Sequence, residues 1–161
     1  MVLNIHAREY PVAAERLGEL LDGLASDRDR LWPSHRGPAM RLDGPLGPGA
    51  KGGHGPIRYT VESYLPGRSV RFRFTGPKGF AGWHGFDVER LGEGRSRLTH
   101  TVRAELRGAM RLQWPLAYRW LHDAAVEDAL DCAARALEQP TAVRPFSPLV
   151  RLLRRLKRRS R

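Results

Sequence analysis

Residues 57–74 read IRYTVESYLPGRSVRFRF, in which apolar and polar side chains alternate on both sides of Pro66-Gly67. An alternation with a period of two is typical of a β-strand that buries one face. Proline presets the backbone of the second position of a turn, and glycine accepts the positive φ of the third position in a type II turn. The stretch therefore predicts two antiparallel strands, 57–65 and 70–74, that share one apolar face.

The same alternation continues in two further segments, 82–88 and 98–106. The glycine-containing turns Gly76-Pro77-Lys78-Gly79 and Gly92-Glu93-Gly94 precede these two segments. Four strands joined by short turns predict an antiparallel meander with one buried face. The side chains that this alternation directs to the buried face include Tyr59, Phe72, Phe74, His84, Phe86 and His100.

The segment before the meander combines a strand, helices and a loop. Residues 2–9 alternate like another strand, and an apolar stripe over residues 12–24 predicts a helix. Ser26 is placed to cap a short second helix that ends near Trp32-Pro33. Residues 43–56 hold six glycines and three prolines, which predicts a loop.

After the meander the apolar period changes to that of a helix, which we expect from Ala109 to Gln139, before Pro140. Pro115 either kinks this helix or marks its true start. The residues expected on its apolar stripe are Met110, Trp114, Ala117, Leu121 and Ala124, widened by Leu116 and Trp120. Only this helix is long enough to cover the apolar face of the sheet. We therefore predict an α+β fold in which an antiparallel sheet wraps around a long C-terminal helix.

The net charge of +11 is concentrated at the C-terminal end of the chain. From Arg144 onward there are eight basic residues and no acidic one, and removing these eight charges leaves +3 for residues 1–143. A domain this close to neutral does not have the charge of a nucleic-acid-binding module. We therefore divide the chain into one domain, residues 1–139, and a basic tail, residues 140–161.

The chain has no window that is long and apolar enough to span a bilayer, and its N-terminus alternates like a strand instead of resembling a secretory signal. Cys132 is the only cysteine, so no internal disulfide is possible, and we expect it to be a buried, inert core residue. The expected compartment is the cytoplasm.

Several stretches resemble the START-like, or SRPBCC, superfamily of helix-grip domains, in particular its bacterial polyketide cyclase/dehydrase-like members. They are Tyr10-Pro11-Val12, Leu31-Trp32-Pro33, Gly55–Tyr59, Val70–Phe74, Gly82–Phe86, Trp114-Pro115-Leu116 and Leu121-His122-Asp123. The resemblance covers residues 1–139. It implies a cavity between sheet and helix that binds a hydrophobic ligand such as a lipid, polyketide or quinone; only some members catalyse cyclisation or dehydration.

The buried face of the meander and the helix stripe predict which residues line this cavity: Tyr59, Phe72, Phe74, His84, Phe86, His100 and Trp114. A few polar groups in an apolar pocket are typical of a small-molecule site, and histidine is suited to acid–base chemistry near neutral pH. The alternative is that both histidines are core residues satisfied by a backbone carbonyl or water. We expect residues 43–56 to form a flap over the mouth, with His54 at its end.

The same residues argue against a metal site or a cofactor. No inward Asp, Glu or Cys accompanies His84 and His100 on their strands, and a metal needs three or four convergent ligands. His122-Asp123 and Glu127-Asp128 place mixed ligands on the helix, but the spacing of five between His122 and Glu127 suits a shared face poorly.

Binding or transport of a lipophilic small molecule is therefore the leading functional hypothesis. The alternative is a polyketide cyclase/aromatase-like enzyme in which His84, His100 or Tyr59 moves protons. Polar groups that converge on one part of the cavity would favour the enzyme, whereas scattered groups would favour a carrier. A third class, an adaptor that binds protein or nucleic acid through the tail, needs no cavity chemistry.

The tail predicts an amphipathic helix after Pro148. Its apolar face holds Leu149, Leu152, Leu153 and Leu156, and the rest is largely basic: Arg151, Arg154, Arg155, Lys157, Arg158 and Arg159. Leucines that enter the acyl boundary and arginines near anionic headgroups favour an anionic membrane surface as partner, at the inner face of the membrane. The alternatives are nucleic acid, since arginine binds phosphate without leucines, and a solubilising tail that is disordered or docked on the domain.

Overall fold

The computed structural model describes residues 1–142 and 145–159, with side chains up to Leu156. Arg144 and Arg161, which contribute to the basic charge of the tail, lie outside the described residues, as do the side chains of Lys157, Arg158 and Arg159. None of the helices in the described part of the chain is long and apolar enough to cross a bilayer.

The described residues form one antiparallel sheet of seven strands in the order β1-β7-β6-β5-β4-β3-β2. Its strands are β1 Val2–Tyr10, β2 Arg41–Leu42, β3 Lys51–His54, β4 Ile57–Leu65, β5 Ser69–Gly76, β6 Phe80–Gly92 and β7 Arg95–Leu106. The predicted meander is confirmed as β4 to β7. The first strand, β1, joins the sheet beside β7, with His6 opposite His100.

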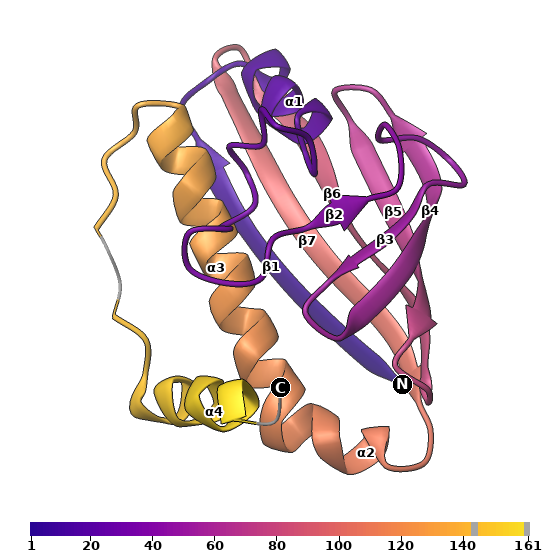
Figure 1. Cartoon of the computed structure of the whole chain (residues 1–161). Coiled ribbons are helices and arrows are strands. Elements are labelled where there is room, and N and C mark those ends of the chain that lie inside the picture. Colours follow the sequence, from indigo (N-terminus) through magenta and orange to yellow (C-terminus); the bar gives the residue numbers. More distant parts are fainter. Residues whose placement is uncertain (143–144, 160–161) are drawn as a thin grey trace.

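The helices are α1 Ala14–Asp22, α2 Met110–Gln113, the π-helical turn η1 Trp114–Tyr118, α3 Arg119–Ala136 and α4 Pro148–Arg159. The run from α2 through η1 to α3 is continuous and lies across one face of the sheet, while α1 covers the end of the same face (Figure 1). The predicted α+β fold, a sheet wrapped around a long late helix, is confirmed.

Three local predictions were wrong, and the first concerns the short second helix after Ser26. Residues 26–31 form turns and bends instead. The carboxylate of Asp29 accepts hydrogen bonds from the backbone amides of Leu31 at 2.9 Å and Trp32 at 2.8 Å. Aspartate side chains that satisfy nearby amides in this way compete with helix formation.

The second wrong prediction is the loop over residues 43–56, because part of it is strand β3, paired with β4. Glycine is depleted in strands, which favoured a loop. Here the glycines permit a close approach: a Cβ atom on Gly52 would lie 1.9 Å from the carbonyl oxygen of Arg41, and one on Gly53 would lie 2.1 Å from that of Ile57. His54 is therefore held at the end of a strand.

The third correction concerns the stripe of the long helix. Met110 and Trp114 are buried as predicted, but Leu116 is 67% exposed and Trp120 is 42% exposed. Leu116 lies within the π-helical turn and Trp120 just after it, where each turn takes up more residues than in an α-helix. Ala117, Leu121 and Ala124 stay partly buried as the stripe predicted, so only the two residues expected to widen the stripe face outward.

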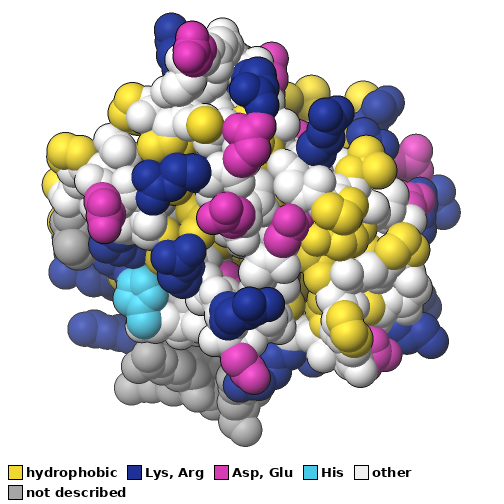
Figure 2. Space-filling view, turned by 90° about the horizontal axis from the view of Figure 1, so that it is seen from above, with side chains coloured by type: hydrophobic (Ala, Val, Ile, Leu, Met, Phe, Trp, Pro, Cys, Tyr) yellow, Lys and Arg dark blue, Asp and Glu magenta, His cyan; other side chains and the backbone are white. Residues whose placement is uncertain are grey.

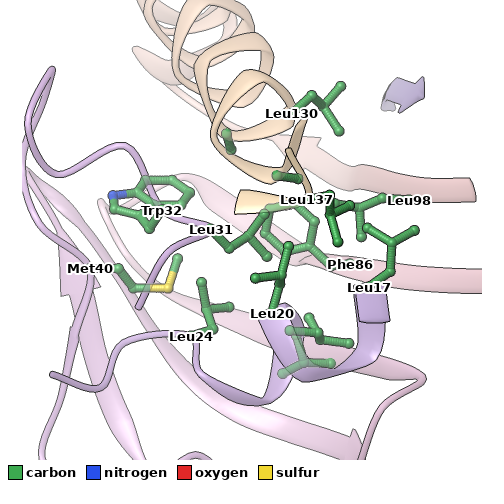
Figure 3. Packing of buried hydrophobic residues seen from close by; sticks show 14 of the residues in the cluster. Leu17, Leu20, Leu24, Leu31, Trp32, Met40, Phe86, Leu98, Leu130 and Leu137 are labelled. Atoms are coloured by element: carbon green, nitrogen blue, oxygen red, sulfur yellow. The ribbon is translucent and has the colours of Figure 1, made fainter. Parts of the chain in front are cut away.

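The core divides into two groups of buried residues. The larger joins the leucines of α1 to the sheet and the end of α3, and Figure 3 shows Leu17, Leu20 and Leu24 meeting Phe86, Leu98, Leu130 and Leu137. The smaller lies at the other end of the sheet and contains Phe80, Val102, Ala104, Met110 and Trp114. Cys132 is buried as expected, and burial raises the pKa of its thiol. The surface over the face seen in Figure 2 carries basic and acidic side chains interspersed.

The contact between α1 and the β4–β5 turn provides a stability test. A Cβ atom on Gly18 would lie 2.6 Å from the carbonyl oxygen of Gly67. We expect Gly18→Ala to lower the free energy of unfolding by about 1–3 kcal/mol, although alanine is the better helix former, because backbone atoms must move apart. Urea unfolding measures this change. Gly44→Ala is the control, since nothing lies within 4 Å of that position, and a Gly18→Ala protein as stable as wild type would contradict the contact.

Candidate functional site

A pocket of about 520 Å³ lies between the sheet, α3 and the segment before β2. Its apolar wall comes from both core groups and from the long helix, and includes Trp32, Phe74, Phe80, Val102, Trp114, Tyr118 and Leu121. Four histidines also line it: His54, His84, His100 and His122. Its rim is formed by residues 33–38, 55–57 and Arg154.

The residues predicted from the sequence to line the cavity divide into two groups. Phe74, His84, His100 and Trp114 line the pocket. Tyr59, Phe72 and Phe86 lie behind this wall, fully buried in the larger core group. All three have the predicted inward orientation, but other side chains stand between them and the pocket.

The pairing of β6 with β7 positions the two central histidines. His84 is opposite Val102 and Phe86 is opposite His100, so both imidazoles extend from the same face of the sheet. Their ring centroids are 5.6 Å apart. The alternation in the sequence was sufficient to predict this arrangement.

The two imidazoles belong to a longer series, which we call the histidine row: His54, His84, His100, His122 and His6. Successive ring centroids in it are 6.1, 5.6, 5.1 and 6.1 Å apart. The row runs from β3 across the sheet to α3 and β1. Sequence analysis missed His122 and His6 as members. For His6, the sequence indicated that residues 2–9 form a strand, but it did not indicate that this strand pairs with β7.

Three members of the row each have a buried ring nitrogen without a hydrogen-bond partner among the described residues: Nε2 of His84, Nδ1 of His100 and Nε2 of His122. Burial lowers the pKa of all three imidazoles, and those of His84 and His100 fall well below the usual value. A buried polar atom without a partner costs about 1–3 kcal/mol. These nitrogens are therefore sites where a ligand or water gains a hydrogen bond.

Tyr59, considered above as a group that moves protons, is oriented away from this role. Its hydroxyl lies 3.1 Å from Nδ1 of His54, behind the pocket wall. Burial raises the pKa of the phenol strongly, so that it stays protonated. Its contact with His54 instead fixes the orientation of that imidazole, which also lies against the ring of Trp32.

Both the tail and the predicted flap contribute to the lining of the pocket, the tail through Arg154. Of residues 43–56, only the end from His54 onward lines the pocket. At the rim, the ring of Phe146 lies between the guanidinium groups of Arg36 and Arg154, each 4.2 Å from its centroid. Arg36 also pairs with Asp128 of α3 at 3.1 Å. These contacts hold the start of the tail at the pocket entrance.

The far end of the histidine row is charged. Nδ1 of His6 lies 2.8 Å from Oε1 of Glu127, and its Nε2 lies 3.2 Å from Oδ1 of Asp123. The hydrogen bond with Asp123 raises the pKa of His6 despite partial burial. Burial opposes ionisation of Asp123, but hydrogen bonds from His122, His6 and Asn4 hold its pKa below the usual value.

Neither the protein-family models nor the curated sequences compared with this chain give a match. Solved structures do match. A protein from Thermobifida fusca has a TM-score of 0.66 at 15% identity and covers 89% of this chain and 100% of its own. Norcoclaurine synthase from Thalictrum flavum, in complex with dopamine and hydroxybenzaldehyde, has a TM-score of 0.63 at 15% identity, with coverages of 88% and 89%. CalU16 from Micromonospora echinospora has a TM-score of 0.57 at 14% identity, with coverages of 98% and 84%.

Identities this low establish a shared fold and nothing finer. They confirm the helix-grip fold that the START-like resemblance predicted.

The neutral imidazoles make stability depend on pH. Because folding depresses the pKa of His84 and His100, the unfolded chain binds protons below about pH 6.5 that the folded chain does not. Stability is therefore lost as the pH falls below that value, by up to about 1.4 kcal/mol per pH unit for each such histidine. His6, with a raised pKa, acts in the opposite sense.

Between pH 7.5 and pH 5.5 the wild type should lose free energy of unfolding. We expect His84→Gln to reduce this loss by about 1.4 kcal/mol, the contribution of one histidine over one pH unit. Urea unfolding at the two pH values measures this difference within each protein, so a general loss of stability cancels. His35→Gln, an exposed histidine at the rim, is the control and should show the wild-type difference. If His84→Gln retains the full difference, His84 is not a neutral buried imidazole.

Proposed function

We propose that this protein binds a lipophilic small molecule bearing hydroxyl or carbonyl groups in the pocket between its sheet and α3. The supporting observation is an apolar pocket of about 520 Å³ with three buried imidazole nitrogens that have no partner among the described residues. The volume lies within the range of known ligand sites, which typically combine apolar walls with a few placed polar groups.

The protonation of the histidines narrows the class of ligand. A neutral imidazole offers one donor and one acceptor, so His84, His100 and His122 suit neutral polar groups better than a carboxylate. Phe74, Phe80 and Trp114 offer aromatic surface beside them. The neighbour norcoclaurine synthase, in complex with dopamine and hydroxybenzaldehyde, supports an aromatic ligand with hydroxyl or carbonyl substituents.

The second candidate is a polyketide cyclase-like enzyme that folds a reactive chain in this pocket. The observation that favours it is the convergence of His84, His100 and His122 along one wall. A neutral imidazole can accept a proton from a substrate and, once protonated, donate it to another atom of the same substrate. The sequence alone predicted His84 and His100 in the pocket but not His122.

The two candidates are separated by recovering the ligand. Native mass spectrometry of protein purified from its own host should show a hydrophobic molecule bound to the chain. A carrier returns that molecule unchanged after incubation with fresh protein. A cyclase or dehydratase gives a product that has cyclised or lost water, and His100→Ala should slow its formation.

A pair of model compounds tests the polar contacts. We expect the wild type to bind 1-naphthol, and His100→Ala to weaken this binding by roughly 5- to 150-fold, the equivalent of a lost hydrogen bond of about 1–3 kcal/mol. Binding of naphthalene, which lacks the hydroxyl, should change much less. Naphthol fluorescence measures both, with Arg103→Ala, an exposed residue of β7 outside the pocket lining, as the control. Equal losses for the two compounds would make His100 a packing residue only.

We further propose that α4 binds an anionic membrane surface and so places the pocket entrance beside the bilayer. Leu149, Leu152 and Leu156 are 40–54% exposed along one side of the helix, next to exposed Arg151 and Arg155. Val150 is buried and Leu153 and Arg154 are half-buried, so these face the domain and not the proposed membrane. Figure 1 shows α4 lying beside the N-terminal half of the long helix.

Vesicle sedimentation tests this second proposal. The full chain should sediment with vesicles containing phosphatidylglycerol at low salt and release as salt rises, because arginines near such a surface contribute about 1 kcal/mol each. The double variant Leu149→Ser/Leu152→Ser should bind much less. Leu65→Ser, an exposed leucine of β4, is the matched control. Wild-type protein that ignores these vesicles would contradict the proposal, and nucleic-acid binding that survives the double variant would favour the alternative partner.

A further inference from the structure

We propose that His6, His122 and Asp123 form a binding site for one transition-metal dication of the zinc class, where β1 meets α3. The three side chains each present one ligand atom, and all three atoms lie within 4.8 Å of one another. His6 comes from β1, whereas the other two are consecutive residues of α3. The site lies at the charged end of the histidine row, outside the pocket except for the ring of His122.

Two of the three distances between ligand atoms are close to those around a tetrahedral zinc ion. Nε2 of His6 lies 3.2 Å from Oδ1 of Asp123, and Nδ1 of His122 lies 3.3 Å from the same oxygen. Bonds of about 2.1 Å in tetrahedral geometry place neighbouring ligand atoms about 3.4 Å apart. The third pair, the two histidine nitrogens, lies within 4.8 Å, and the side chains would adjust to bring all three atoms around the ion.

The groups around the three ligands form hydrogen bonds that orient the ligand side chains, as such groups do in known metal sites. A metal-bound histidine usually donates a hydrogen bond from its other ring N–H to a carboxylate. Nδ1 of His6 lies 2.8 Å from Oε1 of Glu127, as this arrangement requires. The other oxygen of Glu127 accepts from Arg8 at 2.9 Å, which fixes the carboxylate. Asn4 donates to Oδ1 of Asp123 at 3.0 Å, which orients the third ligand.

A second observation beside the three ligands is compatible with a cation nearby. Oδ1 of Asn4 is buried and accepts no hydrogen bond from the described residues, although its amide nitrogen is bonded to Asp123. An acceptor oxygen that lacks a donor is suited to a metal ion or to a water bound to it. The guanidinium of Arg119 approaches Oδ2 of Asp123 at 3.6 Å and so does not occupy the side of Oδ1.

The donor set selects the class of metal. Two imidazole nitrogens and one carboxylate oxygen suit Zn²⁺, Co²⁺ or Ni²⁺ better than Mg²⁺ or Ca²⁺, which prefer oxygen ligands. Three protein ligands leave a fourth position for water. The ion would tie the edge strand β1 to α3, in addition to the pairing of Arg8 with Asp131.

The metal would also act on the pocket through His122. An ion on Nδ1 leaves the ring proton on Nε2, the buried nitrogen that has no partner among the described residues, and so makes His122 a hydrogen-bond donor. Its ring is 5.1 Å from that of His100. This consequence rests on the ligand binding proposed above, whereas the metal site itself does not.

Cobalt spectroscopy of the full, untagged chain, treated first with EDTA, tests the site. We expect one Co²⁺ per chain with the intense visible bands of four-coordinate cobalt, displaced by one equivalent of Zn²⁺. His6→Gln and Asp123→Asn should each weaken cobalt binding at least tenfold, and Glu127→Gln should weaken it by about 10- to 100-fold as an outer-shell residue. His35→Gln is the control and should bind as wild type.

A loss of cobalt binding in a variant could also come from misfolding. A variant that gains a new absorption band separates the two explanations, because a misfolded protein would not show it. His122→Cys replaces a nitrogen ligand by a thiolate and should add a sulfur-to-cobalt charge-transfer band in the near ultraviolet. No saturable cobalt binding at micromolar concentrations would overturn the proposal, as would binding that His6→Gln and Asp123→Asn leave unchanged. Because the naphthol titration can be run in EDTA, loss of the metal site and loss of the ligand site give different results.

Discussion

A sheet with one apolar face must keep that face out of water, and a single helix is too narrow to cover seven strands. Strands about 4.8 Å apart make such a sheet roughly 29 Å wide, whereas a helix with its side chains measures about 10–12 Å. In this chain α1 covers one end of the face and the long helix runs along the side of the face formed by β1. The pocket is the space between the sheet and the long helix that the side chains of neither fill.

The histidine row extends across this space, and its two ends differ in electrostatics. At His84 and His100 the surroundings are apolar, so burial keeps the imidazoles neutral. At His6 the carboxylates of Asp123 and Glu127 favour the charged form instead. Three buried nitrogens that find no partner in the described part of the chain cost stability that an apolar side chain would not. Departures of this kind from ideal packing are expected where a protein binds something.

The tail connects this pocket with the surface. The contacts of Phe146 with Arg36 and Arg154, and of Arg36 with Asp128, hold the tail against the rim. The exposed leucines of α4 face away from the domain. A partner that engages these leucines would therefore lie near the pocket, and the contacts of Phe146 and Arg36 at its rim are those that such an encounter would disturb.

Much of the fold could be predicted from the sequence because its signals are local. The alternation of residues 57–106 was enough to predict the meander and to place His84 and His100 on one face, and the apolar period after Ala109 was enough to predict a covering helix. The same local rules were wrong where another interaction prevailed. Asp29 satisfied backbone amides in place of a helix, glycines entered β3, and Leu116 and Trp120, within and just after the π-helical turn, are exposed.

The members of the candidate site beyond His84 and His100 were decided by tertiary structure. His6 and Asp123 are separated by 117 positions, and nothing in either segment indicates that β1 lies beside β7 and under α3. The sequence by itself determined which face of each strand is apolar, because that depends only on the alternation of neighbouring side chains. Which strands and helices meet depends on how the whole apolar face is covered, and only the folded chain decides that.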